Sequence, residues 1–208
     1  MDIETSPPLE SVSAPLRSPA IGILGGGAWG TTLAQICQQA GSTSVIWSRQ
    51  GDISLEEVVR SSTILISAIS MKGVPEIIDR VQHLGLPSHT ILVTATKGLD
   101  GESLKTPSVL WQRIFPQNPV VVLSGPNLAT EIRQGLPAAT VVASSHPAAA
   151  PIVQKVLASD RFRVYTNTDP LGTELGGTLK NVIAIAVGVC DGLKLGTNAK
   201  SALMTRAL

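Results

Sequence analysis

The sequence is poor in aromatic residues, in cysteine and in runs of like charge, and each shortage excludes a class of protein. Only 3% of the 208 residues are Phe, Trp or Tyr, too few for a surface that stacks nucleic-acid bases. The formal net charge is +1 and no block of one sign occurs, so no charge draws the chain to nucleic acid or to an anionic membrane. Two distant cysteines, Cys37 and Cys190, do not make a disulfide framework, and we therefore expect a reducing compartment, the cytoplasm.

Long apolar stretches and metal-binding spacings are missing as well. The apolar run 182–187 is too short for the ~20 residues of a membrane span, so none is expected. Residues 1–19 are rich in Ser and Pro and lack the basic start and apolar centre of a signal peptide, which predicts a disordered tail. The three histidines, His83, His89 and His146, show no ligand or triad spacing. We expect them at the surface and expect no metal.

What the sequence does contain is an alternation of short apolar strands with helices from residue 20 to residue 169. Strands are predicted at 20–25, 44–48, 63–69, 90–94, 120–123, 139–143 and 162–165. Helices are predicted at 31–40, 55–61, 74–84, 106–115, 127–134 and 148–158. Because the strands are almost continuous apolar runs, we expect them to be buried on both faces of a mainly parallel sheet. The pattern predicts an α/β, doubly wound, Rossmann-type domain over residues 20–169.

The pattern changes after Asp169. From there to the end only helix signals occur, with a break at 192–198. We therefore expect residues 170–208 to be the N-terminal part of an all-helical second domain. A helix pair with an apolar face needs more chain or a second protomer to cover it, which makes a homodimer one expectation.

A glycine loop lies between the first predicted strand and the first predicted helix. Gly25, Gly27 and Gly30 stand in it as G-x-G-x-x-G. The first glycine permits a tight turn, the second lets the backbone approach a pyrophosphate, and the third allows the helix to pack closely on the strand. The free amides and dipole of the helix N-terminus then favour phosphate. This setting predicts a dinucleotide site, against the alternative of a glycine-rich turn without a ligand.

The choice of dinucleotide is expected to depend on the end of the second strand, which reads SVIWSRQ and contains no acid. An acid there would bind the ribose 2′-hydroxyl of NADH, whereas an arginine such as Arg49 can pair with the 2′-phosphate of NADPH. We expect NADPH to be accepted, and NADH remains open because Asp52 lies close by. The alternative for Arg49 is a solvated surface arginine.

Three further loops follow predicted strands at the edge where ligands gather in open parallel sheets. They carry Ser70, Lys72, Lys97, Ser124, Gly125 and Asn127. Lys97 directly follows a buried strand and suits an anionic substrate, although a loop lysine in water is the alternative. Asn127 can cap the next helix, at an end that is itself an anion site.

The stretch GGTLKNVIAIAVG, residues 176–188, places Lys180 and Asn181 before an apolar run. A helix that is apolar all round is normally buried, and burial lowers the pKa of a lysine and suits it to acid–base chemistry. We therefore expect Lys180 to be buried and catalytic. The alternative is a lysine that reaches water from the helix end.

Taken together, these motifs resemble those of bacterial-type NAD(P)-dependent glycerol-3-phosphate dehydrogenases. The resemblance covers residues 21–208 and rests on IGILGGGAWGTTLA, TATKGLDG, VVLSGPNLATEI and the long segment that begins RFRVYTNTDPLGTELGGTLKN. It implies reversible hydride transfer between NADPH or NADH and dihydroxyacetone phosphate, which gives glycerol 3-phosphate for phospholipid synthesis.

The resemblance also implies roles for individual positions. Lys180 matches the general acid/base and also contacts substrate, and Lys97 lines both the substrate and the cofactor sites. Gly125 and Asn127 match substrate contacts. Cofactor contacts are implied for the three loop glycines and for Ala28, Trp29, Arg49 and Ala129.

Two departures accompany the resemblance. The stretch between Arg49 and Glu56 is shorter than is usual in the family, and the family's substrate domain normally continues well beyond residue 208. Two other functions stay open at this point. One is a β-hydroxy acid dehydrogenase, and the other is a truncated nucleotide-binding module without turnover.

Overall fold

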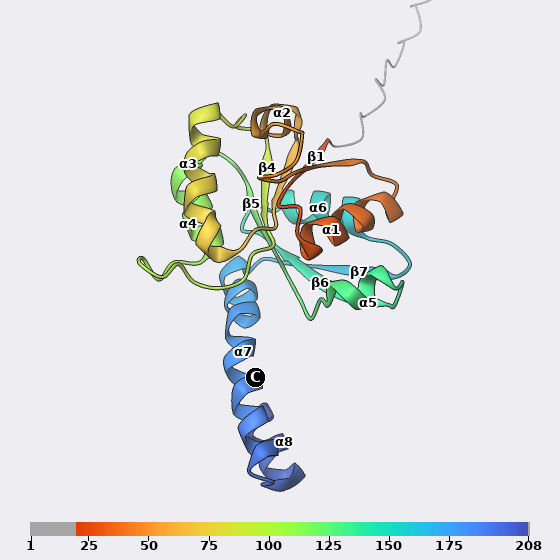
Figure 1. The fold of residues 1–208 in the computed structure, drawn as a ribbon, viewed down its shortest axis with the longest axis vertical. Coiled ribbons are helices and arrows are strands. Elements are labelled where there is room, and N and C mark those ends of the chain that lie inside the picture. The colour runs from red at the N-terminus through yellow and green to blue at the C-terminus, as the bar shows by residue number, and fades with distance from the viewer. Residues whose placement is uncertain (1–19, 208) are drawn as a thin grey trace, which may run out of the picture.

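The computed structural model describes residues 20–207, so the tail expected at 1–19 lies outside the described residues. Its centre is one sheet with the strand order β2-β1-β3-β4-β5-β6-β7 (Figure 1). The strands are β1 Ile21–Leu24, β2 Ser44–Trp47, β3 Ile64–Ser67, β4 Ile91–Thr94, β5 Val120–Ser124, β6 Ala138–Ala143 and β7 Phe162–Asn167. Each of the seven expected strands is present, with ends that differ by no more than two residues.

The first five strands run parallel, in keeping with their apolar sequences. Leu24, Ser67 and Thr94, the last residues of β1, β3 and β4, are aligned in register, so the chain leaves these strands at one edge of the sheet. Strand β6 pairs antiparallel with β5, and β7 pairs parallel with β6. The sheet is therefore mainly parallel, as expected, and its outer pair is reversed.

Helices cover both faces of the sheet (Figure 1). One face packs against α1 (Ala28–Gln39) and α6 (Ala149–Leu157), and the other packs against α2 (Leu55–Ser61), α3 (Val74–Leu84) and α4 (Pro107–Ile114). A short 3₁₀ turn, Met71–Gly73, precedes α3, and α5 spans Ala129–Arg133. The helix starts follow from local chemistry: the Ser54 hydroxyl accepts a hydrogen bond from the Glu57 amide at 3.1 Å, and proline opens both α3 and α4.

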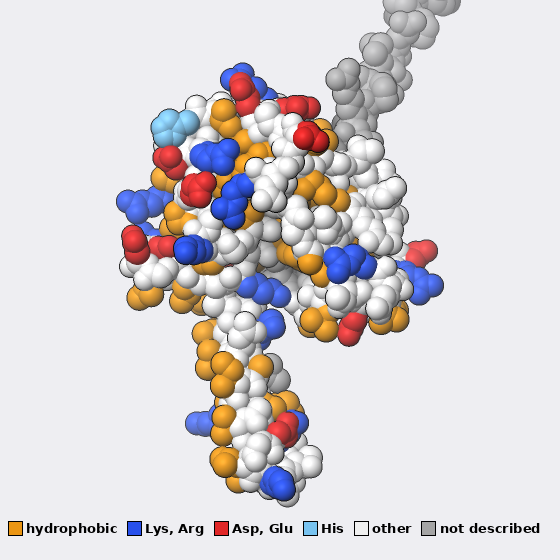
Figure 2. Space-filling view, in the orientation of Figure 1, with side chains coloured by type: hydrophobic (Ala, Val, Ile, Leu, Met, Phe, Trp, Pro, Cys, Tyr) orange, Lys and Arg blue, Asp and Glu red, His pale blue; other side chains and the backbone are white. Residues whose placement is uncertain are grey.

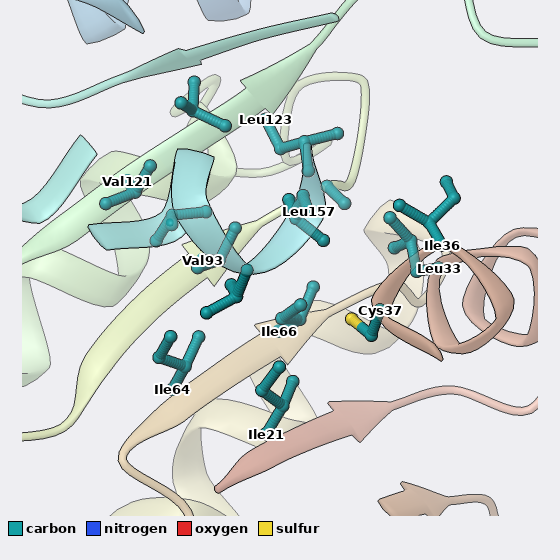
Figure 3. Close-up of a cluster of buried hydrophobic side chains, with 14 of the residues drawn as sticks. Ile21, Leu33, Ile36, Cys37, Ile64, Ile66, Val93, Val121, Leu123 and Leu157 are labelled. Carbon is teal, nitrogen blue, oxygen red and sulfur yellow. The ribbon is translucent and has the colours of Figure 1, made fainter. Parts of the chain in front are cut away.

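The core consists of two apolar layers, one on each face of the sheet. The layer beneath α1 and α6 includes Ile66, Leu33 and Leu157, all fully buried (Figure 3). Cys37 lies in this layer, and burial raises the pKa of its thiol to about 12. Cys37 therefore serves the packing of this layer, since a thiol of that pKa is inert. Trp111 anchors the opposite layer.

Two helices follow the sheet, in agreement with the helix signals found after Asp169. Helix α7, Pro170–Gly192, begins at Asp169, whose carboxylate accepts a hydrogen bond from the Gly172 amide at 2.8 Å. Helix α8 spans Gly196–Ala207 and is joined to α7 by an ion pair of 2.7 Å between Lys200 and Asp191. Figure 1 shows α7 leaving the strand edge and projecting away from the sheet.

The expectation that the apolar part of α7 is buried was wrong for this chain. Val182 is 63% exposed and Ile185 is 69% exposed, and Figure 2 shows apolar side chains along the projecting helices. The reason is geometric: the first turns of α7 pack on the sheet edge, and among the described residues only α8 accompanies the rest. Over its 23 residues α7 is also long and apolar enough to cross a membrane, unlike the short run considered from sequence. A single such helix is weak evidence for a span.

Candidate active site

The glycine loop forms the tight turn that its spacing predicted. Gly25 has φ +120°, and a β-carbon there would crowd the Ala68 carbonyl oxygen. At Gly30 a β-carbon would overlap the carbonyl oxygen of Gly25, so α1 packs on the loop as only glycine allows. Gly27 is the N-cap residue of α1, and a β-carbon built there would meet nothing within 4 Å.

Helix α1 begins at Ala28, three residues before the expected start at Thr31. Ala28 and Trp29 therefore belong to the first turn of the helix, whose amides have no carbonyl partner within the helix. That placement suits the cofactor contacts implied for both residues. A helix N-terminus behind a glycine turn is a binding site for a phosphate group.

A cavity of about 500 Å³ opens beside this turn. It is lined by residues of the glycine loop, of the end of β2 and of the segment after β3, which include Gly25, Gly27, Ser48, Arg49 and Ser70. Its volume is typical of a small-molecule site. The structure thus brings Arg49 to the glycine loop as expected, whereas Asp52 is not among the lining residues. A phosphate-bearing dinucleotide fits this cradle of glycine backbone and one guanidinium.

A second cavity, of about 340 Å³, lies where α7 meets the ends of the strands. Ser124 and Gly125 line it from β5 and the following loop, and Gly176, Gly177 and Lys180 line it from α7. A β-carbon on Gly177 would overlap the Ser124 hydroxyl oxygen, so a glycine is required for this close approach. The loop glycine and the helix lysine implied as substrate contacts are therefore brought together.

Lys97, in the loop after β4, contacts the Gly125 loop, although it is not among the residues that line the second cavity. Its Nζ donates a hydrogen bond of 2.9 Å to the Gly125 carbonyl oxygen, and the Gly98 amide donates one of 3.2 Å to Thr178 on α7. Burial lowers the pKa of Lys97, and the nearby charge of Lys180 lowers it further. Two ammonium groups that repel each other beside a cavity favour an anionic ligand between them.

Lys180 itself is exposed, so the expectation that it is buried was wrong. Its Nζ donates a hydrogen bond of 3.1 Å to Oδ1 of Asn181, its neighbour in the sequence. The lysine stands at the point where α7 leaves the sheet, and no other described element covers that part of the helix. Its position beside Ser124 and Gly125 nevertheless agrees with substrate contact.

Asn127 does not cap α5, as had been expected from its place before that helix. The N-cap residue is Leu128, and Ala129, an implied cofactor contact, begins the helix. The Asn127 amide instead donates a hydrogen bond of 2.8 Å to the Ala139 carbonyl oxygen and accepts one of 3.0 Å from the Thr140 hydroxyl. The NH₂ group and the oxygen of the Asn127 side chain therefore hold this loop against β6, which runs antiparallel to β5.

Glu174 was not singled out from the sequence, yet it is the buried carboxylate of α7. It accepts hydrogen bonds from the amide and the hydroxyl of Ser108 in the first turn of α4. Burial raises the pKa of Glu174, and these donors partly offset the effect. The side chain fastens α7 to the nucleotide domain six residues before Lys180. The signal in the sequence is a single acid within residues 171–179, a helical segment that otherwise carries no charge.

The remaining titratable groups do not form a metal site within residues 20–207, where no group of three or more His, Cys, Asp or Glu side chains gathers. The three histidines are exposed, as expected.

Comparison with known proteins gives the same family over nearly the whole chain. The sequence model described as the NAD-dependent glycerol-3-phosphate dehydrogenase N-terminus matches residues 20–54 and 50–150, and the model of the C-terminus of that enzyme matches residues 169–208. A curated glycerol-3-phosphate dehydrogenase [NAD(P)+] of Synechocystis sp. is 60% identical over 190 residues, and that of Nostoc sp. is 58% identical over 193.

A solved structure agrees with these matches. The crystal structure of glycerol-3-phosphate dehydrogenase from Coxiella burnetii superposes with a TM-score of 0.81 at 33% identity and covers 91% of this chain. The chain spans 60% of the Synechocystis protein, 63% of the Nostoc protein and 66% of the Coxiella chain. The match is thus close over the shared part and leaves a third or more of each relative unmatched.

Proposed function

The chain belongs to the NAD-dependent glycerol-3-phosphate dehydrogenase family, and from that premise we propose that it takes part in reversible hydride transfer between NAD(P)H and dihydroxyacetone phosphate. The product in the reducing direction is glycerol 3-phosphate, a precursor for phospholipid synthesis. The observation that carries this proposal is the meeting of Lys97, Gly125 and Lys180 at one strand edge, next to a glycine loop that fits a dinucleotide.

The cofactor is proposed to lie along the glycine loop. Gly25, Gly27 and Gly30 let its pyrophosphate reach the N-terminus of α1, where Ala28 and Trp29 form the first turn. Arg49 supplies the guanidinium at the adenosine end. The remaining proposed cofactor contacts are Ala129, at the start of α5, and Lys97, and they lie at the end of the cofactor nearest the substrate.

The substrate is proposed to lie between α7 and the loops after β4 and β5. Lys97 holds its negative charge, with Gly125 and Asn127 beside it, and Lys180 moves the proton at the oxygen on C2. When bound, the reduced nicotinamide supplies the hydride. In the reducing direction Lys180 donates a proton to that oxygen, and in the oxidising direction neutral Lys180 accepts it.

These roles assign a function to each part of the chain. We propose residues 20–169 as the dinucleotide-binding domain and residues 170–208 as the first part of the substrate domain.

Because the apolar side of α7 is exposed, we propose that a second copy covers it in a homodimer. Cys37 and Cys190 are free thiols, which supports the reducing cytoplasm as the compartment.

A second function has one observation in its favour. Lys180 is exposed, which fits a nucleotide-binding module without turnover. The two functions are separated by following NADPH and NADH absorbance with dihydroxyacetone phosphate added. Oxidation supports the dehydrogenase, and cofactor binding without oxidation supports the module.

A further inference from the structure

Thr178 of α7 makes a hydrogen bond that joins the helix of Lys180 to the loop of Lys97. Its hydroxyl oxygen accepts a hydrogen bond of 3.2 Å from the Gly98 amide, and both residues are half-buried. Gly98 directly follows Lys97, and Thr178 lies two residues before Lys180. Within residues 20–207, no other hydrogen bond joins residues 95–100 to α7. The shortest connection between the two lysines therefore runs through this contact.

The backbone of Lys97 is held on both sides, and Thr178 holds one of them. On the other side, the Thr96 hydroxyl donates a hydrogen bond of 2.9 Å to the carbonyl oxygen of Ile69, which follows β3. Gly98 has φ +121°, a conformation that residues with a β-carbon rarely adopt, so the chain turns sharply just after Lys97. Loss of the bond to Thr178 would leave this turn attached on one side only.

On α7, Thr178 is the second of two attachment points along one face of the helix. The first is Glu174, which lies four residues earlier, about one turn, and accepts hydrogen bonds from Ser108 of α4. Glu174 by itself ties the helix to the nucleotide domain at one point. Because Thr178 adds a second point one turn further on, the direction of the helix axis is fixed where Lys180 follows.

The relative placement of the two ammonium groups depends on these attachments. Lys97 donates a hydrogen bond of 2.9 Å to the Gly125 carbonyl oxygen, and Lys180 lines the second cavity beside Gly125. Burial lowers the pKa of Lys97, and the charge of Lys180 lowers it further, so the two groups are near enough to act on each other. We propose that Thr178 is a positioning residue, whose hydrogen bond holds Lys97 and Lys180 at the spacing at which a phosphate-bearing substrate fits between them. This inference rests on the proposed function, because that substrate is the one proposed there.

The test compares Thr178→Val, which keeps the branched shape and removes the acceptor, with Thr178→Ser, which keeps the hydroxyl. NMR of the 208-residue chain with ¹³C-labelled lysine follows the titration of Lys97 and needs neither substrate nor turnover. Thr178→Val should raise the pKa of Lys97, because the loop loosens from α7 and the charge of Lys180 moves away. The same spectra should show inorganic phosphate bound about fivefold more weakly, which corresponds to the loss of one neutral hydrogen bond. Thr178→Ser should match the wild type in both measurements.

Thr173→Val is the matched control on the same helix. The Thr173 hydroxyl donates a hydrogen bond of 2.7 Å to the Asp169 carbonyl oxygen, so its loss disturbs the start of α7 without touching the Lys97 loop. This variant should be less stable and should leave the Lys97 titration and the phosphate affinity as they are. In a Lys180→Met background, Thr178→Val should shift the pKa of Lys97 less than it does in the wild type, because the charge whose distance it changes is gone.

Two results would overturn the inference. One is a Lys97 titration in Thr178→Val that equals that of the wild type, and the other is an equal shift in Thr173→Val, which would reveal a general loosening of α7. Thr178→Ala, with the better helix former, should give the same shift as Thr178→Val and decides the matter if the valine variant does not fold. The expected shift in a chain that does not oxidise NADPH would support Thr178 and refute the dehydrogenase, whereas oxidation with an unchanged titration would refute Thr178 alone.

Discussion

Gly177 of α7 lies against Ser124 of β5 so closely that a β-carbon at position 177 would overlap the Ser124 hydroxyl oxygen. The same β-carbon would lie 3.7 Å from Cε of Lys97. This contact brings the helix that carries Lys180 to the strand edge that carries the glycine loop. The meeting of the two parts of the chain therefore depends on the absence of a side chain at one position.

Replacing Gly177 with leucine should separate α7 from the strand edge. The added side chain has no room between α7 and Ser124, and we expect a loss of about 1–3 kcal/mol in the free energy of unfolding. Gly176→Leu is the matched control, because nothing lies within 4 Å of a β-carbon there. That control should be neutral or gain up to about 1 kcal/mol from helix propensity. Urea unfolding of both variants gives the comparison, and equal effects would refute the close contact.

Lys97 should titrate differently when Lys180 is removed. Burial and the charge of Lys180 both lower the pKa of Lys97, in that order. Lys180→Met should therefore raise the pKa of Lys97 part of the way towards its ordinary value, and burial should keep it from returning fully. NMR of ¹³C-methylated lysines measures this directly. Lys155→Met, an exposed change on α6, should leave the Lys97 titration as it is, and the same response to both variants would contradict the pairing.

The buried carboxyl of Glu174 should make stability depend on pH. Its pKa is raised in the folded protein, so its protonated form is the one that folding favours. The stabilisation is fully present below the unfolded-state pKa, about 4.3 for glutamate, and is lost as the pH rises through the raised folded-state value. The difference in unfolding free energy between the wild type and Glu174→Gln should accordingly shrink in that direction. The exposed Glu102→Gln should show no such trend, and parallel curves for all three proteins would contradict the burial.

How far the sequence predicted the fold depends on how local each signal was. Helix α3 was predicted at its observed residues, because proline at its start and apolar spacing along its length are local features. The reversal of β6 was not predicted, since apolar strands of either direction look alike. Helix α1 begins before Thr31 because Ala28, Trp29 and Gly30 already form its first turn.

The site was predicted less completely, and the reasons are again physical. The glycine loop, Arg49 and Lys97 follow the ends of β1, β2 and β4, as the strands predicted from the sequence indicated. Asn127 was misread because its partners, on β6, are distant in the sequence. Glu174 was missed for the same reason, since its donor lies on α4. The burial expected for Lys180 depended on neighbours that the described chain does not place beside it.

The exposed apolar side of α7 predicts self-association. Val182, Ile185 and Val189 are each more than half exposed and recur at helical spacing. Ile185→Glu should place a charge in the proposed dimer contact and shift the protein towards monomer, without loss of helical content. Sedimentation equilibrium over a range of concentrations measures the shift, and a wild type that is monomeric throughout would contradict the proposed homodimer.

The measurement that tests the account most directly is the oxidation of NADPH by the 208-residue protein with dihydroxyacetone phosphate, compared with that by Lys180→Met. The account predicts substrate-dependent oxidation by the wild type, its loss in the variant, and NADPH binding that is nearly equal in both. Oxidation that persists in Lys180→Met would contradict the proposed acid/base role, and a wild type that binds NADPH without oxidising it would contradict the proposed activity of this chain.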